Sequence, residues 1–148
     1  MQTTLKLAAL FLLAAPIVAH ADDAKQVLDR HVAGMKKGDL EAVMADYADN
    51  AVVITPHGIA PGQKAASSVD VFAGKANARK LFSVLTDKGH VGGNRSMKTR
   101  YEDRGNDVTA MYWRQNQGTP QDVSGVDIFV IRDGKIAFQD VTVDATPH

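Results

Sequence analysis

Apolar side chains between positions 27 and 55 follow first a helical and then a strand periodicity. A first stripe recurs every three to four residues from Val27 to Met35, and Gly38 can take the left-handed conformation that ends a helix. Asp39 can cap a second helix, whose stripe covers 40–47 and ends at Tyr47. β-Branched residues then predict a strand over 51–55, which Pro56 ends.

The rest of the chain predicts one more helix and then a series of strands. Glycines, prolines and serines indicate a loop over 57–70, and a third helical stripe covers 78–85. Two glycines indicate a flexible connection over 90–94. The second half of the chain predicts antiparallel strands joined by short turns, over 95–104, 108–116, 123–131 and 135–143.

The order of these signals resembles the NTF2-like superfamily. There a helix, a Gly-Asp break, a second helix and a Tyr-Ala-Asp-Asp-Ala-Val run ending at proline recur, and 28–56 carries similar letters. The resemblance extends to Asp144 and includes SnoaL-like and ketosteroid isomerase-like domains with the cystatin-like cone fold. It implies an α+β fold in which three N-terminal helices pack on a curved, mainly antiparallel sheet around a pocket. It implies no single reaction, since this fold hosts isomerases, dehydratases, cyclases and binding proteins.

Residues 1–21 have the parts of a secretory signal peptide. A short segment with one lysine precedes an apolar run over 7–18, and Ala19-His20-Ala21 has the small-x-small pattern of a cleavage site. The run is shorter than the ~20 residues that span a bilayer, although an uncleaved anchor is the alternative. We therefore expect cleavage after Ala21, one domain over 22–148, a periplasmic or secreted location and no membrane span in the mature chain.

Composition narrows the class of protein. A chain of 148 residues suits one domain, and its 17 basic residues balance 17 acidic ones, so no charge field favours nucleic acid. The sequence has no cysteine, and its five histidines lack the spacing of a metal site. It also has neither a nucleotide-binding glycine loop nor a Gly-x-Ser-x-Gly elbow. We expect no metal and no cofactor.

The strand over 123–131 is apolar on both faces. Alternation puts Val126 and Ile128 on one face, and Phe129 and Ile131 on the other. Helices can cover only the concave face of the sheet, so the convex face needs a different partner. We expect a second copy of the chain there, as the resemblance also implies, and therefore a homodimer through the sheet.

Asp127 is the one carboxylate among the apolar residues of this strand. A lone buried carboxylate must be paired, hydrogen-bonded or neutral, because burying its charge is costly. The surrounding segment, VSGVDIF, resembles the ketosteroid isomerase segment with a neutral aspartic acid that binds the substrate oxyanion. The resemblance puts His31 at the second oxyanion donor, Thr55 at the proton-transferring aspartate and Gln139 on the pocket wall.

This chain has Thr55 where the isomerases have their proton-transferring aspartate, and this difference leaves two interpretations of Asp127. Threonine does not ionise near neutral pH, so we do not expect the steroid isomerase reaction itself. His31 could take over as the base, with Asp127 as its acid partner, because the reference pKa of histidine is ~6.5. Alternatively, His31 is a core residue and Asp127 holds Arg114.

The register of the hairpin around Gly118-Thr119 decides which side chains accompany Asp127. A turn with an even number of residues puts Tyr112 on the same face of the sheet as Asp127, and a turn with an odd number puts Trp113 there. The ungapped family match favours the even turn, so we choose Tyr112 as a ligand-binding residue. Tyr47 is a further candidate for the pocket, and its alternative is a core tyrosine with its hydroxyl at the rim.

Two classes of function follow. The first is an exported module whose cone-shaped pocket holds a small, largely apolar molecule. The second is a cofactor-free acid/base enzyme, of isomerase, dehydratase or cyclase type, that uses His31 and Asp127. An enzyme needs two titratable groups on one void, whereas a binding protein needs walls and a polar anchor. Because the usual base is missing, the sequence favours the binding module, with the ligand-binding residues Tyr47, Thr55, Tyr112 and Gln139.

Overall fold

The computed structural model describes residues 21–59 and 69–144, so the predicted signal peptide, apart from Ala21, lies outside the described residues. The described chain contains four helices: α1 (Ala21–Lys37), α2 (Leu40–Ala45), α3 (Lys75–Leu85) and α4 (Val91–Ser96). Gly38, with a φ of 69°, ends α1, and Asp39 caps α2 by accepting the N–H of Ala42 at 3.0 Å. Both helix ends lie where the sequence predicts them.

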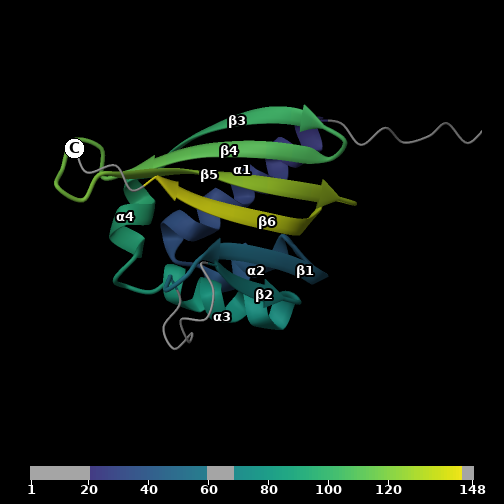
Figure 1. The fold of residues 1–148 in the computed structure, drawn as a ribbon, viewed down its shortest axis with the longest axis horizontal. Coiled ribbons are helices and arrows are strands. Elements are labelled where there is room, and N and C mark those ends of the chain that lie inside the picture. The colour runs from purple at the N-terminus through teal and green to yellow at the C-terminus, as the bar shows by residue number, and fades with distance from the viewer. Residues whose placement is uncertain (1–20, 60–68, 145–148) are drawn as a thin grey trace, which may run out of the picture.

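Six strands form one sheet (Figure 1): β1 (Tyr47–Pro56), β2 (Val69–Ala73), β3 (Lys98–Gly105), β4 (Val108–Gln115), β5 (Val123–Arg132) and β6 (Lys135–Asp144). Their order is β2-β1-β6-β5-β4-β3. β1 runs parallel to β6, and the other pairings are antiparallel. The predicted α+β class with a curved, mainly antiparallel sheet is confirmed.

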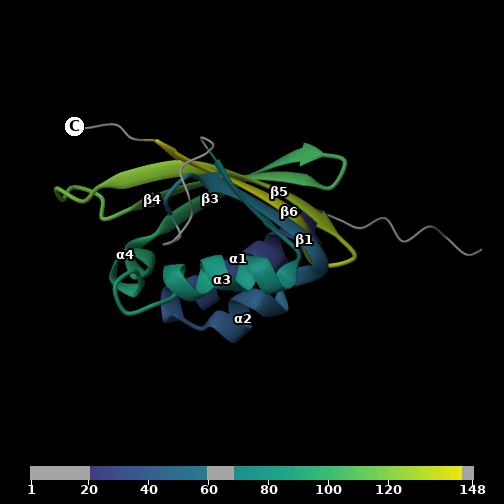
Figure 2. The ribbon, with the colours of Figure 1, turned by 60° about the horizontal axis from the view of Figure 1, so that its bottom comes forward.

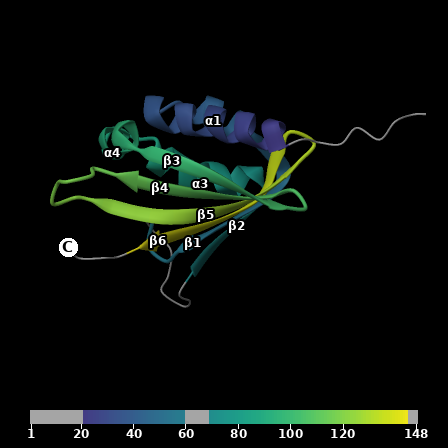
Figure 3. The same cartoon turned by 90° about the horizontal axis from the view of Figure 1, so that it is seen from above.

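The described helices cover one face of the sheet. Figure 2 shows α1, α2 and α3 beneath the curved strands, with α4 at one end, and Figure 3 shows α1 alongside β3. Buried apolar side chains from both layers fill the space between them, among them Leu28, Val43, Leu81, Phe82 and Phe129. This core fixes the distance between the helices and the sheet. At one end the packing leaves room for a cavity between the two layers.

Two elements differ from the prediction. β2 begins in the last two residues of the predicted loop and continues to Ala73, where the sequence predicts no strand. Its exposed Val69 and Val71 alternate with the buried Asp70 and Phe72, as in an edge strand with one covered face. α4 falls across the predicted connection and the start of the predicted strand over 95–104. Its glycines are poor helix formers, but Asn94 anchors it by donating to the carbonyl of Leu85 at 2.7 Å. Both elements depend on tertiary contacts that the local pattern does not contain.

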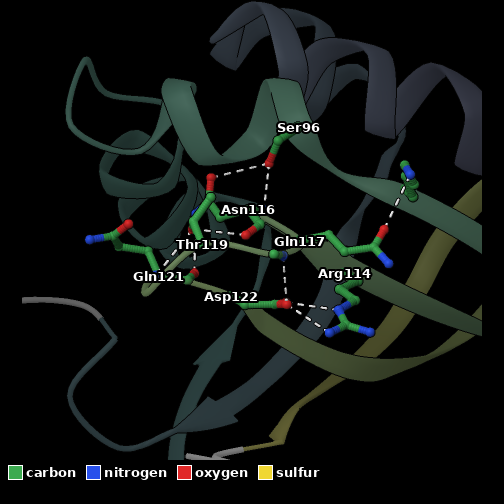
Figure 4. Close-up of polar contacts among 9 residues, drawn as sticks. Ser96, Arg114, Asn116, Gln117, Thr119, Gln121 and Asp122 are labelled. Atoms are coloured by element: carbon green, nitrogen blue, oxygen red, sulfur yellow. Dashed lines mark hydrogen bonds and ion pairs between the residues drawn. The ribbon is translucent and has the colours of Figure 1, made fainter. Parts of the chain in front are cut away.

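The connection between β4 and β5 sets the register at the centre of the sheet. Gln115 pairs with Val123, so seven residues, 116–122, join the two strands. Figure 4 shows how Asp122 holds this connection: it accepts two bonds from Arg114, at 2.8 and 2.6 Å, and one from the Gly118 N–H at 3.0 Å. An odd number of loop residues pairs Met111 with Asp127, so the predicted even register is wrong.

Candidate functional site

A cavity of about 400 Å³ lies between the helices and the sheet. Its wall is mainly apolar, with side chains from α1, α3, β4, β5 and β6. The apolar side chains include Met35, Phe82, Leu85, Met97, Met111, Trp113, Val141 and Val143. A few polar groups interrupt this surface: His31, Thr55, His90, Asn94, Gln115, Asp127 and Gln139. Such a wall suits a small, largely apolar molecule held in place by few polar contacts.

Asp127 is the carboxyl group on the cavity wall, and it is only 5% exposed. Its Oδ1 accepts the indole N–H of Trp113 at 2.7 Å, and its Oδ2 accepts the side-chain N–H of Gln139 at 2.8 Å. Burial raises the pKa of Asp127 to about 7, which the two N–H donors oppose and the nearby Asp140 reinforces. The carboxyl group is therefore held rigidly and changes its charge near neutral pH.

Trp113 reaches Asp127 because of Gly125. Trp113 on β4 and Gly125 on β5 are directly opposite each other, and a Cβ atom on Gly125 would lie 2.5 Å from the indole Cζ2. The same Cβ would lie 2.0 Å from the carbonyl oxygen of Thr142, so the sheet has no room for a larger residue. The glycine thus lets the indole lie across β5 and deliver its N–H to the carboxylate.

Gln139 links Asp127 to a buried tyrosine. The side chains of Gln139 and Tyr47 are almost fully buried, and the Tyr47 hydroxyl donates to Oε1 of Gln139. Burial raises the pKa of Tyr47 well above its usual value, so this phenol stays neutral. Tyr47 is the first residue of β1, not the end of a helix, and it is not among the cavity-lining residues. Its predicted place on the pocket wall is therefore wrong, although it contacts the site through Gln139.

His31 is buried on the helical side of the same cavity. Phe82, Tyr47 and Phe129 surround its ring edge to face, with centroid distances of 5.6, 5.7 and 6.0 Å. Its Nδ1 is buried without a hydrogen-bond partner, and burial lowers its pKa to about 4. Among the described residues, no hydrogen bond or ion pair joins it to Asp127. At neutral pH the cavity therefore carries a neutral imidazole, not a histidine–aspartate ion pair.

The structure brings four of the six predicted site residues to the cavity: His31, Thr55, Asp127 and Gln139. Thr55 is 1% exposed, and its hydroxyl donates to the carbonyl of Pro56 at 3.2 Å. The functional roles of these residues stay predictions.

Tyr112 does not belong to this site. It pairs with Val126 on the opposite face of the sheet, where its hydroxyl contacts Arg104 at 2.7 Å and Glu102 at 3.1 Å. The choice of Tyr112 is wrong because the connecting loop has an odd length. The structural alternative for Asp127 is also wrong, since Arg114 pairs with Asp122.

Sequence reasoning missed Trp113 as a site residue and the polar groups around α4. The odd-turn alternative contained Trp113, but nothing in the sequence fixes the loop length. His90 also lines the cavity, and its Nδ1 lies 2.9 Å from Asp87 Oδ1. Gln115 donates to Asn94 at 3.1 Å nearby. The only sequence signal for these polar groups is local, namely the Asp-x-x-His spacing of Asp87 and His90 in a turn.

The described residues contain no cluster of three or more histidine, cysteine or acidic side chains that could hold a metal ion. Within the same ranges, no helix is long and apolar enough to cross a membrane. The cavity wall offers one carboxyl group, the imidazoles of His31 and His90, and several amide and indole hydrogen-bond donors.

Helices packed on one face of a curved sheet, with a cavity between the layers, define an NTF2-like fold. The chain belongs to the SnoaL-like domain family, whose model matches residues 28–139. None of the curated proteins compared with it matches in sequence.

Solved structures with low sequence identity share the fold. One is an NTF2-like protein of unknown function from Burkholderia xenovorans LB400, at 17% identity and a TM-score of 0.61, with 86% of this chain and 87% of that chain covered. A de novo designed protein with a curved sheet has 15% identity and a TM-score of 0.64, covering 85% and 88%. TerC, co-crystallised with polyporic acid, has 15% identity and a TM-score of 0.58, covering 82% and 92%. At these identities the likeness concerns the fold alone.

Proposed function

We propose that the protein is a binding module whose cavity takes a small, largely apolar molecule with one oxygen that hydrogen-bonds to Asp127. The observation that carries this proposal is the fixed carboxyl group on an otherwise apolar wall. An apolar body gains free energy from leaving water, at ~25 cal/mol per Å² of buried surface, and the single polar contact sets its orientation.

The protonation of Asp127 defines the chemistry of the preferred oxygen. Below its pKa of about 7 the carboxyl group can donate a hydrogen bond, so it suits a carbonyl oxygen. Above that pKa it accepts only, so it suits a hydroxyl group. The neutral His31 adds no charge that would attract an anion. TerC, which shares the fold, was co-crystallised with polyporic acid, and this supports an organic ligand here.

Calorimetric titration with acetylnaphthalene and its carbonyl-free analogue ethylnaphthalene tests this proposal. At pH 5 we expect both to bind, and the ketone to bind more tightly by roughly 10-fold, because a hydrogen bond in a dry site contributes ~1 kcal/mol or more. Asp127→Leu should abolish the difference and keep the binding of ethylnaphthalene. If neither compound binds to the wild type, the proposal is contradicted.

A second candidate function is supported by one observation: two titratable groups of different kinds, His31 and Asp127, line the same cavity. Burial moves their pKa values to about 4 and about 7, so a neutral base and an ionisable acid coexist near pH 6. This arrangement suits cofactor-free proton transfer, as in isomerisation or dehydration. Exchange of the α-protons of acetylnaphthalene with deuterated water would test it. Loss of wild-type exchange in both His31→Leu and Asp127→Asn would support an enzyme.

Export is part of the proposal. The small-x-small pattern at Ala19-His20-Ala21 supports cleavage there. Mass spectrometry of exported protein should find Asp22 at the N-terminus, and Ala19→Arg should leave the longer chain. An intact Met1 in a membrane fraction of the wild type would contradict cleavage.

A homodimer through the uncovered sheet face is the other part. Val126 and Ile128 of β5 lie on this face, and the edge strand β2, separated from β5 by β1 and β6, exposes 56% of Val71. Ile128→Asp should give monomers in sedimentation experiments, because an unpaired carboxylate is costly to bury in an interface. Lys98→Asp, at the far edge of the sheet, serves as the control. A wild type that sediments as a monomer at high concentration would contradict the dimer.

A further inference from the structure

A chain of hydrogen bonds runs from a residue behind the cavity wall to the cavity itself. The Tyr47 hydroxyl donates to Oε1 of Gln139, and Nε2 of Gln139 donates to Oδ2 of Asp127 at 2.8 Å. From the other side, Trp113 donates to Oδ1 at 2.7 Å. Tyr47 is 1% exposed and Gln139 is 2% exposed, so water does not replace these partners. Every donor in this chain is directed towards the carboxyl group.

The orientation of the Gln139 amide depends on Tyr47. An amide can present either its oxygen or its NH₂ group to a neighbour, and the two orientations have nearly the same shape. If the amide turned round, its NH₂ group would face the phenol oxygen, and the buried O–H of Tyr47 would lose its acceptor. A buried donor without a partner is costly, because it has given up its hydrogen bond to water. Tyr47 therefore holds the NH₂ group of Gln139 towards Asp127.

We infer that Tyr47 is a positioning residue that, through Gln139, directs the proton of the protonated Asp127 carboxyl group into the cavity. Both described partners of the carboxyl oxygens, Trp113 and Gln139, are donors in this orientation. Neither can accept the carboxyl proton. The proton is then available to the ligand oxygen, and this part of the inference rests on the proposed function.

Few other charges act on Asp127. His31 faces it from α1 as a neutral ring, and Asp140, its neighbour on β6, raises its pKa. Trp113 from β4 and Gln139 from β6 are uncharged. Tyr47 from β1 stays neutral, because its own pKa is raised well above the usual value. The direction of the Gln139 amide is thus one route by which the uncharged Tyr47 can alter the titration of Asp127.

Tyr47→Phe removes the constraint without adding a charge. Gln139 can then present its oxygen to Asp127 and accept the carboxyl proton, which stabilises the neutral acid. The carboxylate also loses a donor that the phenol had polarised. Both changes raise the pKa of Asp127, and the turned amide also withdraws the carboxyl proton from the cavity. The inference therefore predicts more protonation of Asp127 together with weaker binding of a ketone, a combination that lost packing alone does not produce.

Carboxyl NMR titration of the full chain tests this directly. In Tyr47→Phe we expect the pKa of Asp127 to rise by about half a unit or more, the size expected for losing part of one hydrogen bond. Tyr101→Phe is the control, because it also removes a phenol hydroxyl. The Tyr101 hydroxyl contacts Thr99 at 3.5 Å and lies outside the site. The pKa of Asp127 should not change in this control.

Gln139→Met provides the second variant. It removes the amide, so adding Tyr47→Phe to it should have no further effect on the pKa of Asp127. In the wild type, the side-chain NH₂ signals of Gln139 should follow the titration of Asp127, which tests the orientation even if Tyr47→Phe fails to fold. An unchanged or lowered pKa in a folded Tyr47→Phe variant would overturn the inference, as would NH₂ signals that ignore Asp127.

Ligand binding supplies the other readout. At pH 5, where Asp127 is protonated in both proteins, Tyr47→Phe should reduce the preference for acetylnaphthalene over ethylnaphthalene at least threefold, while Tyr101→Phe keeps it. A preserved preference in Tyr47→Phe would show that the proton still reaches the ligand and would overturn the inference. If neither compound binds the wild type, the proposed function fails, and the NMR titration still decides the role of Tyr47.

Discussion

Trp113 and Asp127 form a hydrogen bond across the β4–β5 pair, with the indole Nε1 2.7 Å from the carboxylate Oδ1. Trp113 is the single tryptophan of the chain and lies on the cavity wall. Its N–H is bonded to the group whose charge changes near pH 7. The intrinsic fluorescence of the protein therefore reports on the site without a label.

Tryptophan fluorescence should show a transition with a midpoint near pH 7, because ionisation of Asp127 places a charge beside the indole. Asp127→Asn should abolish this transition. The imidazole of His90 also lines the cavity, so His90→Asn is the control. This variant should keep the transition; if the transition disappears, the signal does not come from Asp127.

The pH dependence of stability should separate Asp127 from His31. The folded state keeps the Asp127 proton up to about pH 7, whereas an unfolded aspartate releases it near its usual 3.8. Asp127 thus contributes stability below pH 3.8 that is lost as the pH rises to about 7. His31 has a lowered pKa of about 4 against a usual 6.5, so its contribution is present above pH 6.5 and lost as the pH falls to about 4.

Between pH 4 and 6.5 these two contributions oppose each other in the wild type. Relative to the wild type, Asp127→Asn should become more stable as the pH rises, and His31→Leu less stable, each by at most ~1.4 kcal/mol per pH unit. Urea unfolding at a series of pH values measures both differences, and the wild-type reference cancels the other titrating groups. Differences that do not vary with pH would mean that neither pKa is displaced.

Gly125→Ala should destabilise the protein by roughly 2–4 kcal/mol, because the new methyl group meets the Thr142 carbonyl oxygen and the Trp113 ring. Gly92→Ala is the matched control. Its Cβ meets no atom within 4 Å, and alanine favours the α4 helix, so stability should rise by ~0.5–1 kcal/mol. Thermal unfolding compares the two variants. Equal effects would contradict the close packing of the indole on β5.

Trp113→Phe should raise the pKa of Asp127, since the carboxylate loses one of its two N–H donors. Tyr112→Phe changes the neighbouring residue on the other face of the sheet and should leave this pKa unchanged. NMR titration of the carboxyl group distinguishes the two variants. If Tyr112→Phe changed the titration and Trp113→Phe did not, the even register would be correct after all.

The sequence by itself determined the features that depend on neighbouring residues. Gly38 and Asp39 end one helix and begin the next, and Asp133 and Gly134 form the predicted hairpin turn with φ values of 51° and 68°. Helical and strand periodicity also point His31 and Asp127 inwards, because each pattern fixes which face of its own element is apolar. The resemblance to a known superfamily then places these elements in one cone-shaped fold.

Only the tertiary structure decided what surrounds Asp127. Tyr47 and Gln139 are 92 positions apart, and no local pattern specifies their contact. The identity of the indole donor depends on seven loop residues between β4 and β5, because one residue fewer would move every side chain of a strand to the opposite face. β2 and α4 likewise depend on contacts outside their own segments. Asp70 of β2 contacts His57, and Asn94 of α4 donates to the carbonyl of Leu85. Local periodicity fixes the faces of each element, whereas pairing between elements fixes which faces meet.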